Sequence, residues 1–319
     1  MEQQRYKWID IAKGIGIILV VYGHVMRGLN SASLIDKDFF IYSDLIVYSF
    51  HMPLFFFISG LFFMKSIERY KLKQFLVEKC KTLLYPYTIY SLFQMGVMVL
   101  LSNYTNGEED INSLYTCLLV PKAQFWFLFA LFFINLLNAL MLSINKKRCL
   151  WLSIIIGFIY YLFPVDLFMF SETFKYLIFF NMGILAKYVL EIKLTFKHKY
   201  FIVLCTFILV LEYFYIFKIS ENPFLPFIIS MVGTIMVLYL ALSRLQNNLL
   251  LFLIGKHSLE IYLLHILFLA GCRILLNNIF NIQNSLIHIA LGTLCGLFFP
   301  LFISVFINKK YSTYLFRIQ

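Results

Sequence analysis

Long apolar stretches recur from one end of this chain to the other, and they constrain its fold more than any other feature. A helix needs about 20 mostly apolar residues to cross the hydrocarbon core of a bilayer. By that measure the predicted spans are Ile9–Leu29, Asp44–Met64, Leu83–Ser102, Gln124–Ser143, Leu150–Leu167, Thr173–Leu190, Tyr200–Phe217, Phe224–Ser243, Ser258–Leu276 and Leu286–Ile307. The fifth and sixth stretches are short and only weakly separated, by Pro164, Asp166 and Glu172. The pattern predicts an all-α fold, a polytopic bundle of about ten transmembrane helices.

The composition supports lipid as the solvent of this chain. Hydrophobic residues make up 61% of its 319 residues and charged residues only 13%, whereas soluble domains carry about 25% charged residues. The net charge is +11, but no soluble domain offers a basic patch, so nucleic acid is not an expected partner. The six cysteines occur singly, outside any Cys/His cluster. We therefore expect no metal site, no disulfide framework and no bound cofactor.

The positions of Lys and Arg predict the orientation of the spans. If the N-terminus is cytoplasmic, 20 of the 27 basic residues fall in inside segments and six outside, while Lys13 lies within the membrane. The six outside residues are Arg27, Lys37, Lys122, Lys175, Lys218 and Arg273. The positive-inside rule predicts such an alternation for ten spans with both termini in the cytoplasm. Because no extramembrane domain is visible, residues 1–319 are expected to form one integral membrane domain.

The first predicted helix carries four ionisable residues on one face. Eleven residues separate Lys13 from His24, which places them about 16 Å apart along a helix and within about 20° of the same direction. Asp10 and Arg27 extend the group, so that all four fit an arc of about 100°. Ionisable groups inside a span are costly and usually face the bundle interior or a cavity. We call these four residues the polar stripe.

Each member of the stripe also has an alternative interpretation. Asp10 and Arg27 lie within reach of the headgroups, and the Lys13 side chain can extend to the cytoplasmic face. His24 lies past the midplane, where a structural hydrogen bond to a neighbouring helix is the alternative. His51 lies at a matching depth in the second span, next to a kink expected at Pro53. Its alternative role is to satisfy the backbone acceptor that the proline leaves free.

The stripe suits a long anionic donor that enters from the cytosol. Lys13 would hold a phosphate near the inner face, and His24 would act at the far end. A histidine has the unperturbed pKa that proton transfer near neutrality requires, and as a general base it would activate a hydroxyl for attack on an acyl carbonyl. Coenzyme A, with its phosphates and long pantetheine arm, fits such a donor. The geometry permits this interpretation without requiring it.

Motifs along nearly the whole chain resemble the acyltransferase-3 family of membrane acyltransferases. The two most specific ones are Trp8-Ile-Asp-Ile-Ala-Lys13-Gly with Val-Val-Tyr-Gly-His24, and Phe50-His51-Met-Pro53-Leu-Phe-Phe-Phe-Ile-Ser59-Gly60. Weaker ones are Phe125-Trp126-Phe-Leu, Asn181-Met-Gly183 and Ser258-Leu-Glu260-Ile-Tyr262-Leu-Leu-His265. The His-Met-Pro form is similar to the fucose-4-O-acetylase-like and cell-surface sugar acetylase branch. The family's usual core also has ten spans.

The resemblance implies an O-acyltransferase of the bacterial cytoplasmic membrane. It would move an acyl group, commonly acetyl, from cytosolic acetyl-CoA or another acyl-CoA to a sugar hydroxyl on a cell-envelope glycan or its lipid-linked precursor. His24 corresponds to the catalytic histidine and Lys13 to its basic partner, where the family more often has Arg. Only Lys79 and Lys81 stand where the family has paired arginines. Two residues apart, they point about 200° away from each other on a helix, so ordinary positive-inside residues are the alternative.

The remaining polar groups have weaker assignments. Asp10 and His51 are candidates for binding substrate or donor. Trp126 suits either sugar stacking or the aromatic belt of the membrane interface. Glu260 and His265 are expected to hydrogen bond to another helix.

A transporter or a flippase of a lipid-linked glycan is the main alternative to an enzyme. Inverted repeats and broken helices in corresponding halves would support it, and neither is clear in this sequence. A purely structural or regulatory membrane protein is a third possibility, but it leaves His24 without a role.

Overall fold

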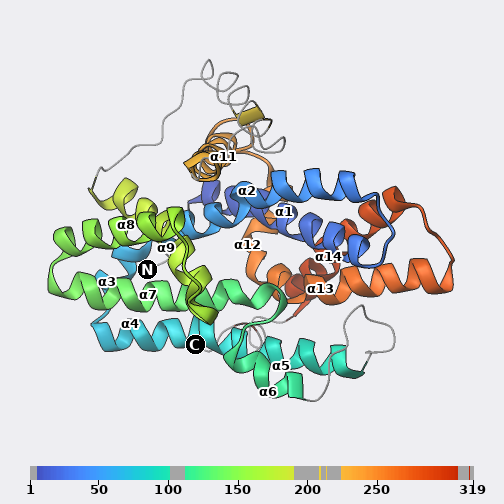
Figure 1. Cartoon of the computed structure of the whole chain (residues 1–319), viewed down its shortest axis with the longest axis horizontal. Coiled ribbons are helices and arrows are strands. Elements are labelled where there is room, and N and C mark those ends of the chain that lie inside the picture. The colour runs from blue at the N-terminus through green and yellow to red at the C-terminus, as the bar shows by residue number, and fades with distance from the viewer. Residues whose placement is uncertain are drawn as a thin grey trace. The chain divides into compact units, whose positions relative to one another are not determined.

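The described parts of the chain are helical throughout. The computed structural model describes residues 6–100, 112–189 and 224–307, together with residues 208, 209, 213 and 316, and these contain no strand (Figure 1). The helices are α1 (Lys7–Ser31), α2 (Lys37–Leu61), α3 (Phe63–Arg69), α4 (Leu72–Lys79), α5 (Tyr85–Leu100), α6 (Asn112–Leu119), α7 (Trp126–Ile144), α8 (Lys146–Leu162), α9 (Ser171–Ile184), α11 (Phe224–Leu242), α12 (Leu249–Lys256), α13 (Ser258–Ile274) and α14 (Ser285–Phe306). Single π-helical turns occupy Cys80–Leu84, Leu185–Val189 and Leu275–Ile279.

Seven of the described helical segments are long and apolar enough to cross a membrane. They are Lys7–Ser31, Lys37–Arg69, Leu72–Leu100, Asn112–Ile144, Phe224–Leu242, Ser258–Ile279 and Ser285–Phe306. These segments coincide with the first four and the last three predicted spans, which confirms an all-helical, multi-pass membrane fold. The fifth prediction falls on α8, of 17 residues, and the sixth on α9 and the π-turn that follows it. The seventh, Tyr200–Phe217, falls almost wholly outside the described residues. Ten spans and cytoplasmic termini therefore stay predictions.

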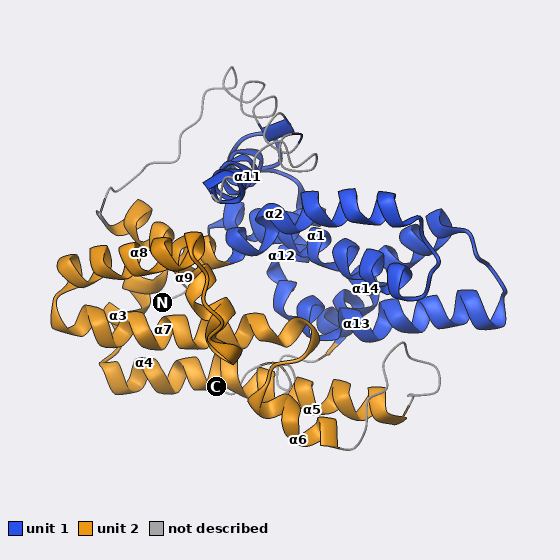
Figure 2. Cartoon of the chain, in the orientation of Figure 1, with its two compact units in different colours: residues 1–55, 193–306 blue, residues 56–192, 307–319 orange. Residues whose placement is uncertain are grey.

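The chain divides into two compact units (Figure 2). Unit 1 comprises residues 1–55 and 193–306, and unit 2 comprises residues 56–192 and 307–319. The boundary falls within α2, so the two units share that helix.

Helix α1 is the centre of unit 1, because α11, α12, α13 and α14 all pack against it. Its closest neighbour is α12, which it meets through two glycines. A Cβ atom on Gly14 would overlap the carbonyl oxygen of Leu251, and one on Gly255 would overlap the carbonyl oxygen of Asp10. Small residues at a helix crossing in a membrane let the two backbones approach closely, and dispersion contacts then hold the pair together. This crossing sets the position of the polar stripe within unit 1.

A proline in α2 is accommodated by a neighbouring helix. Pro53 has no N–H, so the carbonyl of Ser49 loses its helical hydrogen bond. The hydroxyl of Ser230, on α11, donates to that carbonyl at 2.6 Å. A freed backbone group inside a membrane has to find a protein partner, since lipid offers none. The sequence interpretation considered His51 for this role, and the structure gives it to Ser230.

Unit 2 is built around α7, α8 and α9, which pack against one another. A buried chain of polar side chains joins the three helices. The side-chain amide of Asn181 donates to the Ser153 hydroxyl at 2.7 Å, and that hydroxyl in turn lies 3.5 Å from Oδ1 of the Asn138 side chain. Helix α9 also approaches the last turns of α2 through Gly60 and Gly183, where a Cβ on either residue would overlap the backbone of the other helix. Gly183 of the Asn-Met-Gly motif is therefore a packing position.

The glycine crossing in unit 1 is testable by two matched substitutions. Gly255→Ala would force α1 and α12 apart, and we expect it to lower the free energy of unfolding by about 2–3 kcal/mol. Gly271→Ala is the control, because a Cβ there meets no atom within 4 Å. Thermal unfolding in detergent compares the two. Equal stability of both variants and the parent would contradict the backbone contact.

Candidate active site

The polar stripe predicted from the sequence lies on an unbroken helix. Because α1 runs from Lys7 to Ser31 without interruption, Lys13 and His24 are about 16 Å apart along its axis. Asp10 is buried, whereas Lys13 and His24 are partly exposed. Both candidate catalytic side chains therefore remain accessible within an otherwise closely packed helix.

The C-terminal end of the stripe is held by α2. Two nitrogens of Arg27, Nε and Nη2, donate to the two carboxylate oxygens of Asp44 at 2.8 and 3.0 Å. The same guanidinium lies over the Tyr48 ring, 3.4 Å from its centroid. Bidentate pairing and stacking together restrict a guanidinium to one orientation. Arg27 is thus a fixed cation about one helical turn beyond His24.

His24 meets a second histidine, His265 of α13. The centroids of their rings are 5.1 Å apart, and the ring planes are inclined by 55°. The His265 side chain is fully buried. Its Nδ1 lies 2.8 Å from the carbonyl oxygen of Tyr262 and 3.1 Å from that of Ile261. A hydrogen bond to another helix was expected for His265, and the structure shows bonds to its own helix instead.

These contacts determine which nitrogen of neutral His265 carries the proton. A carbonyl only accepts, so Nδ1 must be the protonated nitrogen, and Nε2 keeps its lone pair. Among the residues described, Nε2 of His265 has no hydrogen-bond partner, and the same is true of the Tyr48 hydroxyl. Six other described side chains also carry an unpaired buried atom, so what distinguishes Nε2 of His265 is its position beside the His24 ring.

His51 completes a cluster of three histidines in unit 1. It is buried, its Nδ1 lies 2.6 Å from the Val47 carbonyl, and Tyr48 meets its ring edge to face at 4.5 Å. His51 and Arg27 both lie close enough to His24 to interact with it electrostatically. His24 and His265 are thus in contact, and His51, which the sequence predicted to meet His24, lies within electrostatic range of it. Within the described residues, no group of three His, Cys, Asp or Glu side chains is arranged to hold a metal ion.

The two candidate lysines of unit 2 have different surroundings. The Lys79 amine lies 5.1 Å from the centroid of the Phe75 ring, and the Lys81 amine lies 3.9 Å from the carboxylate of Glu78. A π-helical turn begins at Cys80, between them. The two amines therefore have different neighbours, and the π-turn alters the regular α-helical spacing on which their predicted divergence was based. Their role in donor binding stays a prediction.

Trp126 belongs to a stack of aromatic rings in unit 2. Its ring stacks on Tyr176 with centroids 5.3 Å apart, and Tyr176 stacks on Phe56 at 4.7 Å. Trp126 itself is partly exposed, while Tyr176 and Phe56 are buried. The buried rings hold the indole in place, as both a sugar platform and an interface anchor require.

The comparison with protein families gives one match. The profile of the acyltransferase-3 family, described as an acyltransferase domain, matches residues 6–307. This range includes both histidine partners on α1 and α13 and the candidate residues of unit 2. No curated protein and no solved structure gives a significant match.

The Arg27–Asp44 pair is testable by a double-mutant cycle. Both side chains are partly exposed, at 44% and 21%, so solvent weakens their interaction and we expect a coupling energy of about 0.5–1 kcal/mol. The single substitutions Arg27→Ala and Asp44→Ala and the double variant would be compared by thermal unfolding. Strictly additive losses would show that the pair does not hold α1 to α2.

Proposed function

Because the acyltransferase-3 profile covers most of the chain, the chain belongs to this family of membrane acyltransferases, and we propose that it is an O-acyltransferase that uses His24 as its general base. The donor is a cytosolic acyl-CoA, with acetyl-CoA as the first candidate. The acceptor is a sugar hydroxyl of a cell-envelope glycan or of its lipid-linked precursor, at the bacterial cytoplasmic membrane. The observation that carries this proposal is the contact of partly exposed His24 with buried His265.

The reaction transfers one acyl group and one proton. His24 takes the proton from the acceptor hydroxyl, and the oxygen forms a bond to the thioester carbonyl carbon. The carbon–sulfur bond then breaks, and the sulfur leaves as a thiolate that takes the proton back from His24. The products are the sugar ester and free coenzyme A. A base within hydrogen-bond reach of the hydroxyl contributes about 10²–10⁴-fold to such a step.

His265 acts as a positioning residue for His24. The structure shows no hydrogen bond at Nε2 of His265; in the proposed reactive complex this lone pair accepts the N–H of one ring nitrogen of His24, which leaves the lone pair of the other nitrogen available to the substrate. An orienting acceptor behind the base is the usual arrangement wherever histidine activates a hydroxyl. At 5.1 Å between centroids the rings are in contact, and such hydrogen bonds often tighten only when substrate is bound.

We assign the remaining candidate residues to binding of the donor or the acceptor. Lys13 pairs with a phosphate of the donor, and Asp10, one helical turn nearer the N-terminus, fixes the inner end of the stripe. The distance of about 16 Å to His24 suits the pantetheine arm. The family resemblance alone supports Lys79 and Lys81 as candidates for the phosphates of a donor, and the partly exposed indole of Trp126 is a candidate platform for a sugar. His51 shapes the polar surroundings of His24.

The assignment of acetyl and of the fucose-4-O-acetylase-like branch rests on the His51-Met52-Pro53 motif. Its geometry is consistent with a role in the site, since His51 lies within electrostatic reach of His24.

Replacement of His24 tests the catalytic role. His24→Ala should reduce acyl transfer to the surface glycan at least 100-fold, because the general base is lost, while the protein remains in the membrane at its normal level. Ester-linked acetate on extracted glycan is the measurement. His257→Ala is the control, since this imidazole lies in the same unit and is bound to Ser304. Glycan that stays acetylated in His24→Ala would contradict the assignment, and glycan that no longer reaches the surface would favour a flippase.

Two substitutions of His265 separate positioning from packing. His265→Leu removes the acceptor but fills the site with apolar volume, so we expect kcat to fall about 10–100-fold with KM and thermal stability little changed. His265→Gln keeps an acceptor oxygen and should recover part of kcat. Steady-state kinetics with acetyl-CoA distinguishes the two. If both variants lose stability and activity together, His265 is merely structural.

A further inference from the structure

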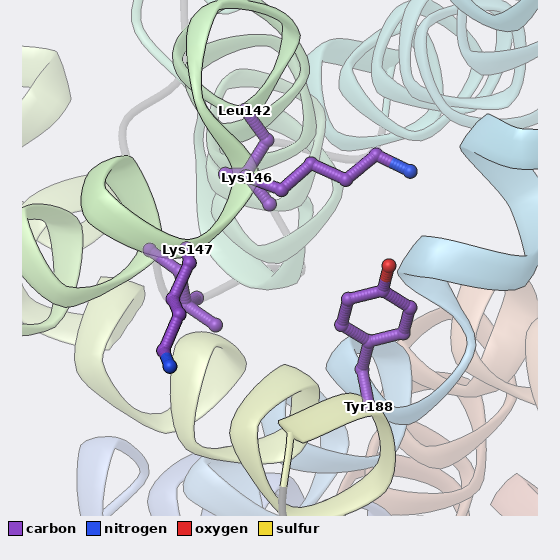
Figure 3. Close-up of a pocket in the computed structure, with 5 residues that line it drawn as sticks. Leu142, Lys146, Lys147 and Tyr188 are labelled. Carbon is purple, nitrogen blue, oxygen red and sulfur yellow. The ribbon is translucent and has the colours of Figure 1, made fainter.

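A cavity of about 200 Å³ lies where α7 ends and α8 begins, in unit 2. Its lining combines two cations, one hydroxyl and two aliphatic side chains: Lys146, Lys147, Tyr188, Leu142 and Leu150. Figure 3 shows the Tyr188 hydroxyl directed toward the Lys146 side chain, while the Lys147 side chain extends in another direction, away from both. None of these residues belongs to the acyl-transfer site described above.

The charge of the cavity favours an anion. Lys146 forms an ion pair with Glu68 at 3.0 Å, so this carboxylate compensates its charge, and Lys147 supplies the uncompensated cation of the cavity. Within the described parts of the chain, Lys147 has no acidic partner. Both lysines are the first residues of α8, a helix of 17 residues, and the N-terminus of a helix adds partial positive charge.

An exposed apolar ridge leads away from the charged end. Trp151, Ile155 and Ile159 follow Lys147 at intervals of four residues, which places them in one row along α8. Their exposed fractions are 45%, 52% and 55%. Inside the cavity, Leu142 and Leu150 are buried. A molecule with an anionic head and an apolar chain therefore matches both parts of this surface at once.

We propose that this cavity binds the phosphate headgroup of an anionic phospholipid, with one acyl chain lying along the ridge of Trp151, Ile155 and Ile159. The positive-inside distribution predicts that Lys146 and Lys147 lie on the cytoplasmic side, where anionic lipids gather and basic pockets between helices bind their headgroups. The volume suits one phosphate and its glycerol. Coenzyme A shares the phosphate chemistry, but its nucleotide and three phosphates need a larger pocket, since sites for drug-sized ligands span about 300–1,000 Å³.

Lipid binding to the purified full-length protein tests this proposal. Native mass spectrometry would measure how much phosphatidylglycerol, relative to phosphatidylcholine, stays bound to the parent protein and its variants. We expect Lys147→Gln to weaken phosphatidylglycerol binding about fivefold, the effect of one lost lysine at an anionic membrane surface. Lys147→Arg should retain binding. Lys175→Gln is the matched control, because this exposed lysine of unit 2 pairs with Glu172, away from the cavity.

Competition identifies the source of the phosphate. Millimolar coenzyme A or inorganic phosphate should leave phosphatidylglycerol bound. Displacement by coenzyme A that depends on Lys147 would overturn the lipid assignment and make the cavity part of the donor site. Equal binding of phosphatidylcholine and phosphatidylglycerol, or no effect of Lys147→Gln, would also overturn it. None of these results depends on catalysis, so the lipid site and the acyltransferase activity can fail separately.

Discussion

The backbone contact of α1 with α12 is the interaction on which the candidate active site depends. Gly14 and Gly255 let the two helices meet without side chains between them, and this fixes the depth of α1 within unit 1. Helices α13 and α14 pack against the rest of α1. Gly296 of α14 lies against Val21 and His265, so the imidazole of α13 is held beside His24. The glycine crossing with α12 at the N-terminal part of α1 thus supports the contact of His24 with His265 in its C-terminal part.

Several buried polar groups among the described residues find their hydrogen-bond partners within the protein. The backbone carbonyl freed by Pro53 accepts a hydrogen bond from the Ser230 hydroxyl. In unit 2, the Asn181 side chain donates to Ser153, and Ser153 donates to the Asn138 side chain. Lipid supplies no hydrogen bonds, so such pairing is required for a stable membrane fold. Within the described residues, Nε2 of His265 has no such partner, and the same holds for seven other buried side-chain atoms, which are spread over both units: those of Tyr48, Ser91, Thr173, Asn181 (Oδ1), Thr234, His288 (Nδ1) and Thr293. The His265 ring lies beside that of His24, whose N–H is the partner that we propose for Nε2.

The sequence predicted the helices and the stripe because both depend on local spacing. The positions of Lys13 and His24 on one face follow from helix geometry alone once α1 is continuous. The contact of His24 with His265 could not be predicted, since it depends on the packing of helices far apart in the chain. Its signal in the sequence was only a histidine in the Tyr-Leu-x-His motif. Similarly, the hydrogen bond from Ser230 to the carbonyl freed by Pro53 could not be predicted, because it depends on the packing of α11 against α2. The π-helical turn after Lys79 also has no signature in its residues.

We propose that His24 moves the proton in an acyl transfer from acyl-CoA to a sugar hydroxyl. The most direct measurement uses purified protein in liposomes that contain a lipid-linked sugar, with labelled acetyl-CoA added on the side of the Lys13 end of α1. We expect that each acetyl ester formed on the sugar is matched by one released coenzyme A thiol, and that His24→Ala abolishes both. Ester formation that continues in His24→Ala, or movement of the sugar across the bilayer without any ester, would contradict it.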